Sequence, residues 1–280
     1  MTAVLFVILI IMTLYLLAIM PRILHRADTA PFINVYYAHR GFHDNQSCAP
    51  ENSMAAFKKA AKLNYGIELD VQLTKDRIPV VFHDFTLNRV CGTKGRVCDF
   101  TYGELEKLRL FQSEETIPRL SDVLEEIDGL VPLIIEYKAN GTDISVCAYC
   151  DALLADYTGS YCMESFNPLA VYWFKKHRPH IMRGQLAMNF FKYGSYNERT
   201  PLYWTLQNLL TNWITRPDFI AYDHRSKFCL SRYLCRYLYH TLSVTWTIQS
   251  QNELDNVKKD NDLFIFEGFI PSYTCNEQTR

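Results

Sequence analysis

The segment from His39 to Asp84 contains HRG at 39–41, PEN at 50–52, GIELDVQLT at 66–74 and VVFHD at 80–84. Short apolar runs end at His39 and His83, and each histidine is followed by a charged residue. We interpret these runs as buried strands. Polar residues at strand ends are typical of active sites in parallel α/β proteins. The segment therefore predicts a parallel α/β fold with an active site at the ends of its strands.

Three carboxylates lie inside apolar strands. Glu68 and Asp70 are two residues apart, so both side chains leave the same face. Glu136 lies in LIIEYK (133–138), where Lys138 shares its face. Buried neighbouring carboxylates repel each other unless a cation compensates them. Hard oxygen ligands without a soft ligand select Ca²⁺ or Mg²⁺ rather than Zn²⁺. A purely structural Glu136–Lys138 pair is the alternative.

The rest of the chain alternates apolar strand patterns with amphipathic helices. We expect further strands at 132–138, 161–167, 182–188, 218–225, 242–249 and 262–269, and helices at 143–156, 168–177, 229–239 and 251–259. About eight such units imply a parallel sheet that closes. This pattern predicts a TIM (β/α)8 barrel over residues 34–270, followed by a tail at 271–280. Net charge is −1, which excludes a basic footprint for nucleic acid.

Residues 3–20 carry no charge and, as a helix, would span about 27 Å, close to the thickness of a bilayer core. Arg22 and Arg26 follow in a linker at 21–33, which orients the barrel toward the cytoplasm. Nine scattered cysteines agree with a reducing compartment. Cys147 and Cys150 form an isolated CxxC without a zinc pattern. We expect a single-pass anchor at 1–20 in the cell membrane, with a secretory signal as the alternative.

Residues 189–217 interrupt the alternation. Thr200 and Pro201 have the pattern of a helix N-cap and first position. An apolar stripe then follows at Leu202, Leu206, Leu209, Leu210 and Trp213. Because this insertion follows the fifth strand of the barrel, we expect it on the catalytic face. The stripe either packs on the core or contacts lipid.

The ordered set of HRG, PENS, GIELDVQLTKD, VVFHD, LIIEYK, ESFNP (164–168) and VTWTI (244–248) resembles the glycerophosphodiester phosphodiesterase family over residues 36–250. It is similar to the bacterial, membrane-anchored type. The resemblance implies that His39 and His83 are the catalytic pair, and it places metal ligands at the three carboxylates named above. Glu51 resembles the PEN glutamate, which binds metal, polyol hydroxyls or neighbouring side chains. Trp246 borders the alcohol-binding part of the pocket or packs in the core.

The resemblance implies hydrolysis of a glycerophosphodiester to glycerol 3-phosphate and an alcohol. That reaction needs charge neutralisation, an activated nucleophile and a proton for the leaving oxygen. Arg40 and Lys138 can hold the phosphate, while His39 and His83 share acid and base roles. Which histidine is the acid stays open, as does the attacking group, water or a substrate hydroxyl. A lysophospholipase D acting on membrane lysolipids and a non-catalytic phosphate- or lipid-binding barrel are the alternatives.

The last strand departs from the family pattern. A Thr-Asp pair followed by proline is typical there, whereas this chain has IFEGFIP at 265–271. We expect Glu267 and Pro271 to fill comparable space. Among the other histidines, His224 follows a strand and is a candidate for the pocket, whereas His177 and His180 are expected at the surface.

Overall fold

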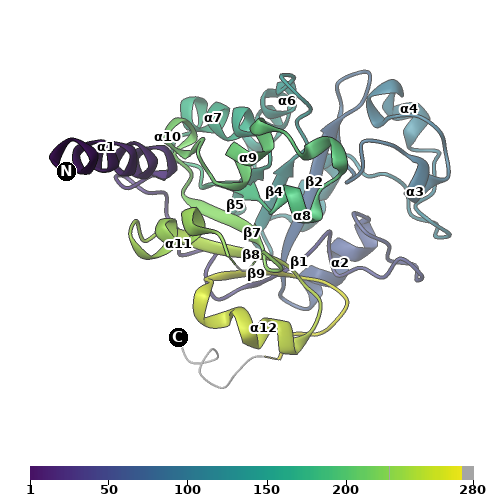
Figure 1. Ribbon diagram of the computed structural model, residues 1–280. Helices are drawn as coiled ribbons and strands as arrows, with labels where there is room; N and C mark the ends of the chain where they lie inside the picture. Colours follow the sequence, from purple (N-terminus) through teal and green to yellow (C-terminus); the bar gives the residue numbers. More distant parts are fainter. Residues whose placement is uncertain (227, 273–280) are drawn as a thin grey trace.

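The computed structural model describes residues 1–226 and 228–272. Eight parallel strands form a closed barrel surrounded by helices (Figure 1). Around the barrel the strands are β1 (Tyr36–Ala38), β2 (Gly66–Leu73), β4 (Leu133–Tyr137), β5 (Tyr161–Ser165), β6 (Arg183–Ala187), β7 (Phe219–Asp223), β8 (Leu242–Ile248) and β9 (Leu263–Phe266). Because β1 pairs with both β2 and β9, the sheet closes and the predicted TIM barrel is confirmed.

The helices of the described residues include those expected at 143–156, 168–177, 229–239 and 251–259, together with several shorter ones. They are α1 (Thr2–Ile19), α2 (Met54–Lys62), α3 (Asn88–Cys91), α4 (Tyr102–Leu105), α5 (Leu120–Ile127), α6 (Ser145–Leu154), α7 (Pro168–His177), α8 (Phe190–Tyr193), α9 (Pro201–Gln207), α10 (Asn212–Thr215), α11 (Leu230–Tyr237) and α12 (Gln251–Val257). Residues 273–280 of the predicted tail lie outside the described residues.

A hairpin outside the barrel carries the VVFHD motif. Strand β3 (Pro79–Val81) runs antiparallel to β2, so VVFHD is not one of the barrel strands. The hairpin returns the chain to the barrel mouth directly before His83. There the Gln72 side chain donates hydrogen bonds to the carbonyls of Phe82 (2.7 Å) and Asp84 (2.9 Å). These two bonds hold the backbone on either side of His83.

The HRG turn and helix α2 fold together at the end of β1. Gly41 has φ +80°, and a Cβ at that position would lie 2.9 Å from Ala56 of the helix. Only glycine permits both the left-handed backbone and this close approach. Ser53 caps α2 by accepting a hydrogen bond from the Ala56 amide at 3.1 Å. Phe57 and Ala60 then bury the apolar face of the helix. This packing fixes the backbone next to His39.

Helix α5 begins at Leu120. Its N-cap is Arg119, whereas Ser121, a better capping residue, lies inside the first turn. Leu120 is fully buried, as are Val123 and Ile127. The apolar face therefore starts at Leu120, and burial of that side chain sets the helix boundary rather than the local capping preference.

The two ends of the barrel differ in chemistry. A cluster of buried apolar residues fills the interior toward the strand starts, and it includes Phe32, Tyr37, Ile134, Phe219, Val244 and Leu263. Polar residues occupy the other end. Asp70, Glu136 and Glu164 pair in register across β2, β4 and β5. The barrel therefore places three carboxylates side by side at one level of its wall.

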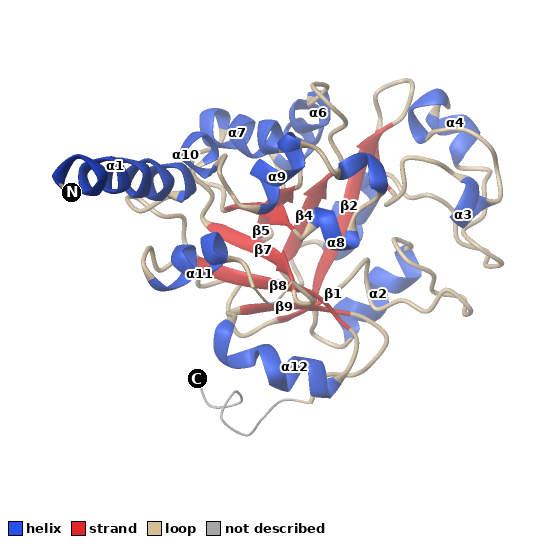
Figure 2. Cartoon of the chain, viewed as in Figure 1, coloured by secondary structure: helices blue, strands red, loops and turns tan. Residues whose placement is uncertain are grey.

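The linker after α1 forms hydrogen bonds and an ion pair with the end of the barrel where the strands begin. The Arg22 amide donates to the carbonyl of Pro217 at 3.0 Å, and its guanidinium lies 3.3 Å from Asp218, just before β7. Arg26 donates to the carbonyl of His240, just before β8, at 2.5 Å. Figure 2 shows α1 leaving the barrel on this side, opposite the arrowheads of β7 and β8.

The last turn of α1 packs into the domain, whereas the residues before it are exposed. The Ile19 carbonyl accepts hydrogen bonds from Asn212 Nδ2 (3.1 Å) and Cys235 Sγ (3.3 Å), and the Ile19 side chain is fully buried. Tyr15 shares a hydrogen bond of 2.8 Å with Ser231. By length and composition α1 is able to cross a membrane. The end of this apolar helix is therefore also part of the packed fold.

The insertion at 189–217 does not form one continuous amphipathic helix. Thr200 caps α9 and Pro201 occupies its first turn, as predicted. The helix ends at Gln207, and Leu209 has a positive φ of 58°. Leu206 and Leu209 are buried, while Trp213 is exposed. The prediction of one apolar stripe is therefore wrong, because the chain turns after Gln207. Two of its leucines belong to the packed layer outside the barrel.

The described cysteines are all free thiols. Cys147 and Cys150 lie buried on α6, and burial raises the pKa of Cys147 to about 12. A buried neutral thiol packs as a small apolar group and is a poor nucleophile or metal ligand. The isolated CxxC is therefore part of the core.

Candidate active site

Glu68, Asp70 and Glu136 form a buried carboxylate cluster. They are 2%, 1% and 8% exposed, and one oxygen of each lies within 4.8 Å of the others. The β2–β4 register brings Asp70 beside Glu136, and Glu68 precedes Asp70 on the same face. Three carboxylates converging on one point provide the hard oxygen ligands that Ca²⁺ and Mg²⁺ prefer. The predicted ligand set therefore comes together in the fold.

The cluster carries more negative charge than the neighbouring cations neutralise. Lys138 Nζ lies 2.8 Å from Glu136 and 2.9 Å from Asp70, and Arg40 Nε lies 3.5 Å from Asp70. Burial and carboxylate repulsion raise the pKa of Glu68 well above its usual range, and burial also raises that of Glu136. Lys138 and the other nearby positive groups overcome burial at Asp70 and lower its pKa. The residues present therefore fit a divalent cation, which would relieve this repulsion.

His39 is held by a carboxylate on the last strand of the barrel. Its Nδ1 lies 2.5 Å from Glu267 Oε2, and Gln249 donates to the other Glu267 oxygen at 2.7 Å. Burial and the charge of Arg40 lower the pKa of His39 to about 4, against the opposing effect of Glu267. The imidazole is therefore neutral near neutral pH. With Nδ1–H donated to Glu267, Nε2 carries the free lone pair and lies 4.0 Å from Glu68.

His83 has its own carboxylate partner. Its Nδ1 lies 2.6 Å from Asp84 Oδ1, and Arg89 donates to Asp84 at 2.7 Å. Arg89 also donates to Glu51, which in turn accepts from Arg40 at 2.8 Å. One chain of charge-assisted hydrogen bonds thus links the His83 loop to the HRG turn. Glu51 therefore bonds to neighbouring side chains, one of the three roles considered for it. It is not one of the three clustered carboxylates.

A small cavity of about 110 Å³ joins these groups. Its walls are His39, Arg40, Glu68, His83, Glu136, Glu164, Phe166, Leu186, Trp246, Thr247 and Ile265. Both predicted catalytic histidines, Arg40 and Trp246 line it together with two of the clustered carboxylates. Trp246 packs edge-on against Phe166 with ring centroids 5.7 Å apart. The cavity therefore combines a charged side with an apolar side.

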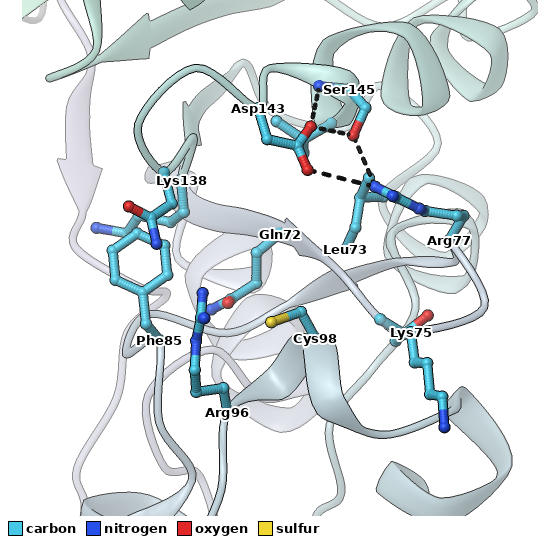
Figure 3. A pocket seen from close by; sticks show the side chains of 13 residues that line it. Gln72, Leu73, Lys75, Arg77, Phe85, Arg96, Cys98, Lys138, Asp143 and Ser145 are labelled. Carbon is cyan, nitrogen blue, oxygen red and sulfur yellow. Dashed lines mark hydrogen bonds and ion pairs between the residues drawn. The ribbon is translucent and has the colours of Figure 1, made fainter.

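A larger, open cleft of about 360 Å³ is shown in Figure 3. Lys138 lines this cleft, and its ammonium contacts Asp70 and Glu136 of the cluster. Phe85, Arg96 and Lys138 also line the cleft, and Figure 3 shows Arg77, Asp143 and Ser145 as a hydrogen-bonded group in its wall. The cleft is polar and accessible to solvent.

Some predicted residues lie elsewhere. His224 does not line the small cavity; it lines a separate cleft and lies 4.0 Å from Glu253. His177 stacks on Trp173 at the surface, and His180 is also exposed, as expected. Pro271 is buried just beyond β9.

The importance of three acidic residues was missed from the sequence. Glu267 was treated as a departure from a pattern and Asp84 as a neighbour of His83, yet both hold histidines. Glu164 is the first residue of ESFNP, but no role was predicted for it. Its signal was a charged residue within the strand YCMES, which is otherwise expected to be buried.

Comparison with known proteins identifies the family. The model of the glycerophosphoryl diester phosphodiesterase family matches residues 39–186. The glycerophosphodiester phosphodiesterase of Bacillus altitudinis is 36% identical over 167 residues, or 55% of this chain and 66% of that protein, just under two thirds of its length. Human glycerophosphodiester phosphodiesterase 1 is 42% identical over 99 residues, or 32% of this chain and 29% of that protein. The resemblance is therefore not confined to bacterial proteins.

The fold agrees with solved structures. A phosphodiesterase of Oleispira antarctica, in complex with the product sn-glycerol-3-phosphate, superposes with a TM-score of 0.69 at 22% identity. The alignment covers 85% of this chain and 94% of that one. Since the family model matches more than half of the chain and the relatives carry the same activity in their names, the chain belongs to the glycerophosphoryl diester phosphodiesterase family of phosphoric diester hydrolases.

Proposed function

We propose that the protein hydrolyses glycerophosphodiesters to sn-glycerol 3-phosphate and an alcohol, with a divalent cation at the carboxylate cluster. One observation carries this proposal. Two histidines, each held by its own carboxylate, face the same cavity as the buried acidic cluster. The product named for the Oleispira antarctica relative supports the choice of substrate. A non-catalytic barrel would not need two oriented histidines beside an uncompensated acidic cluster.

The charged side of the cavity suits the phosphate of a phosphodiester. We assign Glu68, Asp70 and Glu136 as the metal ligands, and the bound cation, Ca²⁺ or Mg²⁺, supplies charge neutralisation of a phosphate oxygen. Arg40 lines the cavity and offers guanidinium donors to a second oxygen. Lys138 adds a positive centre behind the carboxylates. Together these groups favour the extra negative charge of the transition state.

The protonation of His39 suggests how the two histidines divide the work. A neutral His39 with its lone pair on Nε2 is the general base, and it takes the proton from the attacking oxygen of water or of a substrate hydroxyl. His83 is then the general acid that protonates the leaving alcohol. Glu267 and Asp84 stabilise the respective rings, because each accepts a hydrogen bond from Nδ1.

This assignment predicts an acid limb of kcat/KM near pH 4 rather than near pH 6.5, because burial lowers the pKa of His39 to about 4. Protonation of the base below that pH removes activity. Glu267→Gln removes a group that raises this pKa, so the limb should move to still lower pH while kcat falls about 10-fold or more. Rates measured from about pH 3 to pH 8 test this, with folding followed by circular dichroism. An acid limb near pH 6.5 in both proteins would contradict the assignment.

We propose that α1 is a retained membrane anchor. Removing it as a signal peptide would leave the buried Asn212 and Cys235 without the Ile19 carbonyl that both contact. Loss of such buried partners is costly, so the packing favours a helix that stays in place. The basic residues Arg22 and Arg26 follow it and support a cytoplasmic barrel.

The anchor has a direct test. The expressed chain should keep its amino-terminal residues in mass spectrometry and stay with membranes during alkaline carbonate extraction. A labelled tag after residue 272 should react only once the cytoplasmic side is opened. Cleavage near residue 20, or release by carbonate, would show that α1 is not an anchor.

The position of α1 favours soluble substrates over lysolipids of the same membrane. The anchor leaves the barrel where strands begin, while the site lies at the opposite strand ends (Figure 2). A helix crossing the bilayer therefore points the cavity away from the surface. Leu206 and Leu209 are buried, so the leucines predicted as one stripe do not share a single exposed face.

The full chain, reconstituted in vesicles, distinguishes the two substrate classes. We expect kcat/KM for glycerophosphocholine to exceed that for lysophosphatidylcholine in the same vesicles by at least about 10-fold. Soluble enzyme in detergent, with both substrates dispersed, is the control for intrinsic preference. Faster hydrolysis of the membrane-borne lysolipid would favour the alternative.

A further inference from the structure

Helix α11 and the residues after it contact the last turns of α1. Tyr15 shares its hydrogen bond of 2.8 Å with Ser231, and the Tyr239 hydroxyl donates to the Leu16 carbonyl at 2.9 Å. Tyr15 precedes Met20 by about 7.5 Å along the helix axis. The domain therefore extends alongside the apolar helix instead of beginning where that helix ends.

The side of α1 that faces away from the domain stays apolar over the same stretch. Leu14 and Leu17 are exposed there, and the next charged residue along the chain is Arg22. When this stretch lies in the bilayer, the parts of the domain packed beside it lie at the same depth. Charges at that depth are costly, so those parts of the domain must present apolar or interfacial side chains to the lipid.

The exposed residues at the base of α1 meet this requirement. On α10, Asn212 donates to the Ile19 carbonyl, and the neighbouring Trp213 is 54% exposed. Tryptophan prefers the level of the lipid headgroups, where the bilayer is both apolar and wet. The collar, as we call the exposed apolar residues beside the contacts with α1, consists of Trp213 and Ile214 on α10, Leu238 after α11, and Ile23 and Leu24 in the linker.

Basic side chains lie next to the collar. Arg216 follows α10 and donates to the Met20 carbonyl at 3.2 Å. Lys175, in the last turn of α7, donates to the Ile214 carbonyl, and the adjacent Lys176 is exposed. Lysine and arginine near a bilayer surface attract its anionic headgroups. The charge around the collar therefore complements an anionic membrane surface.

We propose that the collar lies in the lipid interface around α1, with the bilayer as its partner. Figure 1 shows α10 and α11 on either side of the end of α1, so lipid meets the domain on both sides of the helix. The linker is also bonded to the barrel through Arg22 and Arg26 and is not a free tether. The contact holds the barrel in one orientation, with the active-site end directed away from the membrane. This inference rests on the proposed anchor.

Quenching of tryptophan fluorescence by brominated lipids tests this contact, with the full chain in vesicles of phosphatidylcholine and phosphatidylglycerol. Helix α1 contains none of the four tryptophans, so quenching reports on the domain. Bromines near the top of the acyl chains should quench more than bromines at the bilayer centre. Trp213→Phe should remove about half of the quenching or more. Trp204→Phe is the matched control and should leave quenching unchanged, because Trp204 is 49% exposed but lies on α9, farther from α1 than α10 (Figure 1).

A second pair of variants tests the other side of the collar. Leu238→Trp in the Trp213→Phe background should restore the quenching. Tyr149→Trp in the same background, at an exposed position of α6, should not restore it. These substitutions exchange exposed apolar or aromatic side chains, and circular dichroism checks that each variant is folded.

The outcomes separate the collar from the anchor. A chain that stays with membranes through carbonate extraction but shows no quenching through Trp213 keeps the anchor and overturns the collar. Equal quenching through Trp204 and Trp213 would also overturn it, because the domain would then have no fixed orientation. Absent quenching together with a dimer in sedimentation would assign the collar to a second copy of the chain. Release by carbonate with quenching through Trp213 retained would overturn the anchor while the lipid contact stands.

Discussion

We expect Glu68→Gln to lower kcat/KM for glycerophosphocholine about 1,000-fold, which corresponds to about 4 kcal/mol of lost transition-state stabilisation. Glu68 supplies one of three converging carboxylate oxygens. Its pKa is raised well above the usual range, because burial and its acidic neighbours disfavour the charged form. Glutamine keeps the shape and can still accept the hydrogen bond from the Arg40 amide, but it is a weaker ligand for a cation.

The same substitution should have the opposite effect on stability in chelator. Removing a charge that its neighbours repel should raise the Tm of the metal-free protein by about 2–4 °C. Added Ca²⁺ or Mg²⁺ should raise the Tm of the wild-type protein but not that of the variant. Differential scanning calorimetry measures both effects, with Glu125→Gln as the control. A variant that keeps the full metal-dependent increase in Tm would show that Glu68 is not a ligand.

The two histidines should respond differently to the leaving group. His39→Ala should lower kcat about 100- to 10,000-fold on glycerophosphocholine and on a p-nitrophenyl phosphodiester of glycerol alike, because both reactions need the base. His83→Ala should show a comparable loss on glycerophosphocholine but less than about 10-fold on the p-nitrophenyl ester. That leaving group is a stable anion and needs no proton.

The control for both variants is His177→Ala, because His177 is exposed and stacks on Trp173 away from the cavity. It should leave both rates within about 2-fold of wild type. If His39→Ala were the variant rescued by the p-nitrophenyl ester, the acid and base roles would be exchanged. Retention of both rates in either alanine variant would remove that histidine from the mechanism.

The barrel could be predicted from the sequence because its strands carry strong local signals. GIELDVQL and LIIEY are apolar runs whose carboxylates share one face of a strand. The structure places the two runs in neighbouring strands. The continuous helix expected after Pro201 failed for the opposite reason. The apolar spacing of Leu202, Leu206 and Leu209 suits a helix, but the positive φ of Leu209 ends it. Packing against the barrel overrides the periodic pattern there.

Residues of the site could be predicted from the sequence when they lie close together in the chain or share a strand. The carboxylate pair at 68 and 70 is an example, since strand geometry alone puts both side chains on one face. Glu267 lies 228 residues from His39, and the contact between them depends on β9 pairing with β1. Closure of the barrel brings Glu267 and His39 together, so no local sequence pattern predicts their contact. Glu164 has the same origin, because its cavity is built from six separate strands and the loops after them.

The most direct test is release of sn-glycerol 3-phosphate from glycerophosphocholine by the purified full chain. The assay runs with Ca²⁺, with Mg²⁺ and with chelator, and His39→Ala serves as the inactive control. We predict release with at least one of the two cations, loss in chelator, and recovery when that cation is restored. Undiminished release in chelator, or equal release by His39→Ala, would contradict a metal- and histidine-dependent mechanism at this site.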